Sequence, residues 1–208
     1  MTRVKICGLV TLEDALAACD AGADALGFNF APEARARGRY IDPADAREIV
    51  RKLPPFVTTV AVCVNPSAAH VAEWLKFLDC VQLHGSESVP FAAAFREKAI
   101  KAFRVSEGFE PESMLDYTTP AYLLDASVPG YSGGSGQAFD WTIAQKAVAL
   151  GTPIILAGGL TPDNVAEAIQ TVRPAAVDTA SGVESAPGKK DHERIRDFVR
   201  NAKNALSG

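Results

Sequence analysis

Short apolar runs recur along the chain, and most of them end at glycine, aspartate or another residue that favours turns. Such runs predict β-strands. Eight strands are predicted, over residues 4–7, 23–30, 58–64, 80–85, 100–105, 121–125, 153–159 and 175–182. Because the runs are continuously apolar rather than alternating, both faces of each strand are expected to be buried, as in a parallel sheet covered by helices.

Helices are predicted between most of these strands. Leu12, Ala15, Leu16 and Cys19 share one face at helical spacing. Residues that can accept from free backbone N–H groups predict helix starts at Thr11, at Asp42 before Pro43, and at Thr161-Pro162-Asp163. Residues 106–120 contain two prolines and little apolar periodicity, so a helix there is expected to be short or missing. A last helical segment is expected at 191–205.

Alternation of strands and helices predicts an α/β fold. Eight units in 208 residues have about 26 residues each, which is the low end for a closed eight-stranded barrel. We therefore predict a single-domain (β/α)8 TIM barrel over residues 1–208, with an open doubly wound sheet as the alternative. No linker, charge block or low-complexity segment divides the chain.

Composition and charge exclude several function classes. Hydrophobic residues are 48% and charged residues 22%, as in folded soluble domains. A net charge of -4 and a pI near 5.4 leave no basic excess for a phosphate backbone, so no nucleic acid partner is expected. No run of about 20 apolar residues could span a membrane. Without a signal-peptide pattern at the N-terminus, the expected location is cytoplasmic.

The four cysteines are expected to be reduced thiols. Without a secretion signal or a C-x-x-C pair, the sequence favours neither disulfides nor a metal site. Cys19, Cys63 and Cys80 are interpreted as small buried hydrophobes. Cys7 differs because it ends a strand immediately before Gly8, at the expected rim of the barrel.

In a TIM barrel the active site lies at the carboxyl ends of the strands. The polar residues predicted there are Cys7, Asn29, Asn65, His84, Arg104, Asp125 and Asp178. Two glycine-rich turns follow the last two strands, one with Gly158 and Gly159, the other with Ser181 and Gly182. Backbone N–H groups in these turns can converge on negative charge, which predicts a phosphate ester as ligand. The bland alternative is that the glycines only serve the turn geometry.

Cys7 and Asp125 are candidates for a base and an acid. Cys7 faces the same way as Lys5 along its strand, so a nearby cation is expected to lower the thiol pKa. Asp125 ends an apolar strand, where desolvation is expected to raise its pKa and suit it to donate a proton. As an alternative, Asp125 caps a loop. The run Gly130–Gly136 after it is interpreted as a flexible loop or as a lid, and the two interpretations are compatible.

Seven ordered motifs add a family resemblance. They are Lys5-Ile6-Cys7-Gly8, Gly22–Phe28, Gln82–Gly85, Leu124-Asp125, Gly133–Gly136 with Phe139-Asp140-Trp141, Leu156–Leu160 and Ser181–Glu184, and Lys190-Asp191 also fits. From end to end the chain resembles phosphoribosylanthranilate isomerase of tryptophan biosynthesis. The resemblance implies an aldose–ketose isomerase that needs no metal or organic cofactor, binds a small phosphorylated substrate and is a monomer or homodimer.

The family's functional residues carry over onto matching positions. The resemblance implies that Cys7 is the general base and Asp125 the general acid. It also implies that an arginine binds the anthranilate carboxylate, in a family motif that has a serine two residues before the arginine. Arg39 aligns best with that arginine, and Arg37 stands where the family has the serine. Arg35 and Arg37 remain alternatives for this role.

Further positions carry binding or lining roles. Ala180 stands where the family usually has serine, although phosphate would still be held by backbone amides at Gly158, Gly159, Ser181 and Gly182. His84 and Asp178 are expected to line the pocket, with structural hydrogen bonding at least as plausible as catalysis.

Other functions remain to be weighed against this one. The related isomerase of the histidine pathway is expected to have aspartate in place of Cys7. The synthase that closes the indole ring needs lysines and glutamates at several strand ends, of which Lys5 and Lys101 are the only hint. From another class, a non-catalytic phosphate-binding barrel would have Cys7 and Asp125 by coincidence.

Overall fold

The computed structural model describes residues 1–106, 108–125 and 141–206. Within these residues, eight parallel strands close into a barrel in chain order, β1 to β8. The strands are β1 (Arg3–Cys7), β2 (Ala25–Asn29), β3 (Thr58–Cys63), β4 (Cys80–Leu83), β5 (Ala99–Arg104), β6 (Ala121–Asp125), β7 (Ile154–Ala157) and β8 (Ala176–Thr179). Pairing of β1 with β8, which sets Lys5 opposite Asp178, completes the ring. The closed barrel is confirmed over the open sheet.

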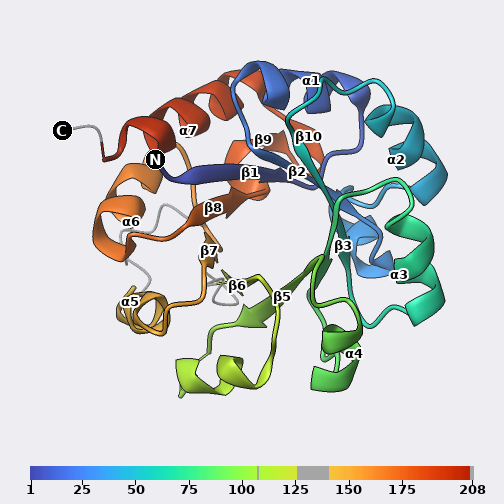
Figure 1. Ribbon diagram of the computed structural model, residues 1–208. Helices are drawn as coiled ribbons and strands as arrows, with labels where there is room; N and C mark the ends of the chain where they lie inside the picture. The colour runs from blue at the N-terminus through green and yellow to red at the C-terminus, as the bar shows by residue number, and fades with distance from the viewer. Residues whose placement is uncertain (107, 126–140, 207–208) are drawn as a thin grey trace.

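Helices surround the barrel (Figure 1). They are α1 (Leu12–Asp20), α2 (Pro43–Val50), α3 (Ala68–Trp74), α4 (Val89–Ala94), α5 (Thr142–Ala149), α6 (Val165–Val172) and α7 (His192–Asn204). The 3-10 helices are η1 (Pro32–Arg37), η2 (Pro111–Asp116) and η3 (Ser181–Val183). Between β5 and β6 the described residues contain only the short η2, as the two prolines predicted. No helix of the described residues has the length and apolar character needed to cross a membrane.

Two of the three predicted helix starts are confirmed. The Thr11 hydroxyl accepts from the N–H of Asp14, 3.1 Å away, and the Asp42 carboxylate accepts from that of Ala44. At the third, the Thr161 hydroxyl accepts from the N–H of Asp163, 3.3 Å away, but the predicted boundary was wrong, because α6 begins only at Val165. There the Asn164 side chain accepts from the N–H of Thr161 and donates to the carbonyl of Gly159, so these residues form a turn that shapes the end of β7.

Two small elements at the barrel mouth were not predicted. One is η1 after β2, and the other is an antiparallel hairpin of β9 (Glu184–Ala186) and β10 (Lys189–Lys190) after β8. They approach each other closely, since a Cβ on Gly38 would lie 3.2 Å from the carbonyl oxygen of Pro187. Of the two, η1 contributes Glu33, Ala34 and Arg37 to the lining of the cavity at the mouth.

The core has two parts of unequal size. Most buried apolar side chains lie in one large cluster that includes helix residues such as Ala15, Ile169 and Phe198. A small second cluster is formed by Ala102, Leu123, Ile155 and Ala157 of β5 to β7. The polar residues Lys5, Gln82 and Asp178 are also buried, at 3%, 1% and 7% exposure. Buried polar side chains of this kind need hydrogen-bond or ionic partners. The partners of these three residues are described with the cavity below.

Candidate active site

A cavity of about 370 Å³ lies over the carboxyl ends of the strands. Its lining includes eight of the nine predicted site residues: Cys7, Arg39, His84, Asp125, Gly158, Gly159, Asp178 and Ser181. Asn29 and Arg104, predicted at the rim, also line it. Asn65 does not; its side-chain oxygen instead accepts from the N–H of Ser86. The tertiary structure therefore brings residues from both halves of the chain to one concave surface.

Cys7 lies deep in this cavity and is 8% exposed. The ammonium of Lys5 is 3.0 Å from the Asp178 carboxylate, and this buried ion pair interacts with the thiol. Burial raises the pKa of Cys7, and the Asp178 charge raises it further, against the lowering effect of Lys5 and Lys190. The lowered pKa expected from sequence was therefore wrong, because the cation came with a counterion and the strand end is buried.

Burial alone would lower the pKa of Lys5. The Asp178 carboxylate outweighs that effect, together with Cys7 when it is a thiolate, so the Lys5 pKa is raised and the amine keeps its proton. At rest the base of the cavity therefore holds a neutral thiol beside an ammonium–carboxylate pair.

The sulfur of Cys7 occupies space that Gly27 of β2 leaves open. The two residues are paired in register, and a Cβ on Gly27 would lie 2.8 Å from the sulfur. Glycine is needed here for close approach rather than for a special backbone angle. The family motif contained Gly27, but only the strand pairing gives it this purpose.

Asp125 at the end of β6 faces His84 from the end of β4. Its carboxylate oxygen Oδ2 is 3.4 Å from Nε2 of His84, and both side chains are about one-fifth exposed. The other ring nitrogen of His84, Nδ1, is 3.2 Å from the amide nitrogen of Gln82. His84 is thus held between a cavity-lining amide and the predicted acid. The raised pKa expected for Asp125 stays a prediction.

The two glycine-rich turns are joined to each other. Gly158 and Gly159 both have positive φ, 93° and 67°, which favours glycine. The hydroxyl of Thr179 donates to the carbonyl of Leu160, 2.8 Å away, and links the turn after β7 to the strand before the second turn. Gly158, Gly159 and Ser181 of these turns line the cavity, at the place where a phosphate was expected.

Gly182 is the predicted site residue that does not line the cavity. A Cβ at this position would lie 1.8 Å from the carbonyl oxygen of Leu160, so the glycine is needed for packing between the two turns. Its carbonyl accepts from the Arg194 side chain. In this structure its contribution is to bring the two turns together.

Arg39 reaches the cavity from the segment after η1. The Glu184 carboxylate accepts two hydrogen bonds from its guanidinium, at 2.8 Å from Nε and 2.7 Å from Nη2. Lys190 also donates to Glu184, at 2.9 Å. Burial raises the pKa of Glu184, but the Arg39 and Lys190 cations outweigh this and lower it. Of the three candidate arginines, Arg35 lies over the Tyr40 ring and is absent from the cavity lining.

The sequence did not predict the contacts that Gln82, Glu184 and Lys190 make with the site residues. Gln82 of β4 and His84 directly after it are two positions apart, a spacing that favours the same face and could have indicated the amide. No pattern along the chain indicates the Glu184–Arg39 pair, because the partners lie 145 residues apart. The predicted lid at Gly130–Gly136 and the motif residues Phe139 and Asp140 lie outside the described residues.

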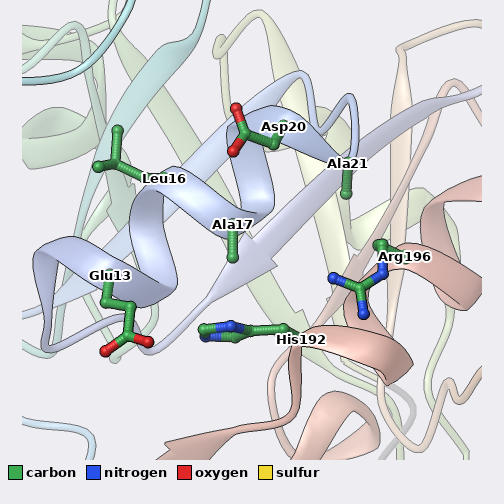
Figure 2. Close-up of a pocket in the computed structure, with 7 residues that line it drawn as sticks. All are labelled: Glu13, Leu16, Ala17, Asp20, Ala21, His192 and Arg196. Carbon is green, nitrogen blue, oxygen red and sulfur yellow. The ribbon is translucent and has the colours of Figure 1, made fainter.

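A second cavity, of about 360 Å³, lies between α1 and α7 (Figure 2). It is lined by Glu13, Leu16, Ala17, Asp20, Ala21, His192 and Arg196, none of them a predicted site residue. Figure 2 shows these side chains on two helices of the outer layer. The candidate active site is therefore the cavity that contains Cys7 and Asp125.

A closed parallel barrel with a polar cavity and glycine-rich turns at its carboxyl ends defines a class, the (β/α)8-barrel proteins with an active-site mouth suited to a phosphorylated ligand. A family model described as N-(5'phosphoribosyl)anthranilate (PRA) isomerase matches residues 4–201. The chain belongs to this isomerase family, as its motifs predicted, and the family consists of intramolecular isomerases.

Individual relatives agree along the whole chain. An N-(5'-phosphoribosyl)anthranilate isomerase of Geobacter sulfurreducens is 51% identical over 205 residues, covering 98% of this chain and 99% of the relative. The crystal structure of phosphoribosyl anthranilate isomerase from Thermotoga maritima matches with a TM-score of 0.89 and 45% identity, over 98% and 100% of the two chains. Another such isomerase, solved in complex with reduced 1-(o-carboxyphenylamino)-1-deoxyribulose 5-phosphate, matches with a TM-score of 0.86 and 42% identity over 98% and 100%.

Proposed function

We propose that this chain catalyses an Amadori rearrangement, with Cys7 as general base and Asp125 as general acid. The substrate is N-(5-phosphoribosyl)anthranilate, and the product is 1-(o-carboxyphenylamino)-1-deoxyribulose 5-phosphate, a step of tryptophan biosynthesis. The observation that carries the proposal is that Cys7 of β1 and Asp125 of β6 line one cavity together with the glycine-rich turns. One sugar ring can then lie between a proton donor and a proton acceptor.

The first step belongs to Asp125. It protonates the furanose ring oxygen, and the anthranilate nitrogen donates its electron pair to C1′ as the C1′–O bond breaks. An iminium with a free hydroxyl at C4′ results. His84 lies within 3.4 Å of the Asp125 carboxylate and can donate to it once the proton has gone.

The second step belongs to Cys7. The iminium makes the C2′ proton acidic, so the Cys7 thiolate can remove it to form an enolamine and a neutral thiol. C1′ of the enolamine then takes up a proton while the C2′ hydroxyl loses one to solvent, which gives the ketone. The adjacent ammonium of Lys5 stabilises the thiolate against the cost of burial. Because burial raises the pKa of Cys7, the thiolate fraction of the free protein grows as pH rises above neutrality.

Binding uses the two ends of the substrate. The backbone N–H groups at Gly158, Gly159 and Ser181 face the phosphate, with Gly182 holding their turns together. Arg39 binds the anthranilate carboxylate: Glu184 engages Nε and one hydrogen of Nη2, which leaves Nη1 directed to other acceptors. Every step uses protein groups alone, so no cofactor is needed.

The test is turnover of N-(5-phosphoribosyl)anthranilate by Cys7→Ala and Asp125→Asn. Each substitution is expected to lower kcat by about 10²–10⁴-fold, because each removes one proton-transfer group. Cys80→Ala is the matched control, since Cys80 lies at the start of β4 and is absent from the cavity lining.

Other outcomes identify the alternatives. A wild type that binds the phosphorylated substrate without turnover would be a binding protein and would refute the proposal. Full activity in Cys7→Ala would remove the base assignment, and full activity in Asp125→Asn would remove the acid assignment.

A further inference from the structure

Gln82 of β4 is a buried amide at the active cavity that the proposed mechanism does not use. It is 1% exposed and lines the cavity two residues before His84. Its backbone neighbours in register are Val62 and Ile100, both apolar. Its amide nitrogen is 3.2 Å from Nδ1 of His84, while its oxygen Oε1 has no hydrogen-bond partner among the described residues. A buried amide that is only half satisfied costs stability and calls for an explanation.

The backbone around His84 is held from several sides. The Lys101 ammonium donates to the carbonyls of Leu83 and Gly85, which flank His84. The Glu87 carboxylate accepts from the N–H of Gly85, and the N–H of His84 itself donates to the carbonyl of Cys63. These contacts fix the position of the His84 backbone, and therefore the point from which its imidazole side chain extends. These contacts do not fix which ring nitrogen carries the proton.

Gln82 supplies the missing constraint. An amide N–H aimed at Nδ1 requires a lone pair there, so the neutral imidazole carries its proton on Nε2. Nε2 is the nitrogen that faces Asp125. In the opposite tautomer, Nε2 would present a lone pair and would draw the Asp125 proton away from the substrate.

We propose that Gln82 is a positioning residue that acts through His84, fixing the imidazole tautomer that donates to the Asp125 carboxylate after that carboxyl has given up its proton. The inference rests on the proposed role of Asp125 as the acid. The unsatisfied Oε1 is the cost of this arrangement. If the Gln82 amide turned over, Oε1 would accept a hydrogen bond from Nδ1 of His84. The ring proton would then sit on Nδ1, and the tautomer would be reversed.

The first experiment compares the wild type with Gln82→Met, which keeps the length of the side chain and removes its polar end. Nitrogen NMR of the imidazole rings should show His84 protonated on Nε2 in the wild type and a mixture of both tautomers in Gln82→Met. His70 and His192 lie outside the cavity lining and serve as internal references. An unchanged His84 tautomer in the variant would overturn the inference.

Kinetics separate this role from packing. Gln82→Met should lower kcat about tenfold, a fraction of what a whole proton-transfer group contributes, while KM changes by less than about twofold. Its thermal stability should stay level or rise, because the variant removes an unsatisfied buried oxygen. A structural residue would show the reverse, with lower stability and kcat retained, and that result would also overturn the inference.

A second test repeats Gln82→Met in a protein that already carries His84→Gln. His84→Gln places an amide N–H near the former Nε2 position, and an amide has no tautomers to select. Adding Gln82→Met to His84→Gln should then leave kcat unchanged within about twofold, whereas an equal loss in both backgrounds would contradict the inference. The charged residues Arg104 of β5 and Asp178 of β8 also line the cavity, and they are unchanged in all variants.

The outcomes distinguish this inference from the proposed function. Full activity in Asp125→Asn removes the acid and, with it, the role that Gln82 serves. Loss of activity in Asp125→Asn with full activity in Gln82→Met refutes the inference alone.

Discussion

At the scale of single residues, the chemistry depends on where one sulfur atom can lie. Gly27 provides the space for the Cys7 sulfur, and Lys5 with Asp178 provides the charges beside it. The thiol is thereby held at the cavity base in a neutral state, since burial raises its pKa. A small residue on one strand thus sets the position of a reactive group on the next.

Replacing Gly27 with alanine tests this packing. We expect Gly27→Ala to lower the free energy of unfolding by about 1–3 kcal/mol through overpacking and to reduce activity by displacing the sulfur. The loss should be smaller when Cys7 is already alanine, because the sulfur 2.8 Å from the new Cβ is then gone. Denaturant unfolding of the four variants in this double-mutant cycle measures the coupling. Equal losses in both backgrounds would contradict this account.

At the scale of elements, α7 holds the end of the chain against the barrel. Its buried residues Ile195, Phe198, Val199 and Ala202 repeat at helical spacing. The helix begins where Asp191 accepts from the N–H groups of Glu193 and Arg194, at 2.9 and 3.1 Å. The N–H of Asp191 also donates to the carbonyl of Val183, so the start of α7 is tied to the turn after β8. One capping residue therefore connects the outer layer to the cavity edge.

Asp191→Ala should lower the free energy of unfolding by about 1 kcal/mol, because two N–H groups in the first turn of α7 lose their acceptor. Asp191→Asn is the matched control, since its side-chain oxygen still caps the helix. Thermal and denaturant unfolding measure both variants. If asparagine were as destabilising as alanine, the charge rather than the cap would be what matters.

At the scale of the whole molecule, buried ion pairs fasten the loops around the mouth. Lys101 pairs with Glu87 at 2.7 Å below the loop after β4, and Lys190 pairs with Glu184 on the other side. Burial raises the pKa of Glu87, but Lys101 and the backbone N–H groups outweigh this, so its pKa is lowered. These pairs give the molecule a defined response to acid.

We expect stability to fall in acid in a specific window. A carboxyl whose pKa is lower in the folded state binds fewer protons there, so its stabilisation is complete above the ordinary glutamate pKa of 4.5 and is lost as pH falls through the lower folded value. Denaturant unfolding between pH 7 and pH 3 measures this. Glu87→Gln should be less stable at pH 7 and lose less stability between pH 4.5 and pH 3.

The control for this prediction is Glu73→Gln, which removes a solvent-exposed pair between Glu73 of α3 and Lys76 just after it. Water screens that pair, so this variant should follow the wild type at every pH. Parallel pH curves for Glu87→Gln and the wild type would show that the buried pair does not control the acid response.

The sequence by itself determined the eight barrel strands, their parallel direction, the glycine-rich turns and the family, because each depends on local periodicity, turn chemistry or a contiguous motif. It also placed Cys7, Asp125 and His84 at strand ends, since strand direction alone puts those ends together. It could not determine the pKa of Cys7, because that depends on the charge of Asp178 and on burial.

Only the tertiary structure decided how these side chains are coupled. It paired Arg39 with Glu184, packed Gly182 tightly between the two glycine-rich turns, and set Gln82 against His84. Such contacts depend on how close residues lie in the folded chain and on where their side chains point. The order of residues along the sequence gives neither. Electrostatics and close packing depend on distances of a few ångströms, and the folded barrel alone sets these distances.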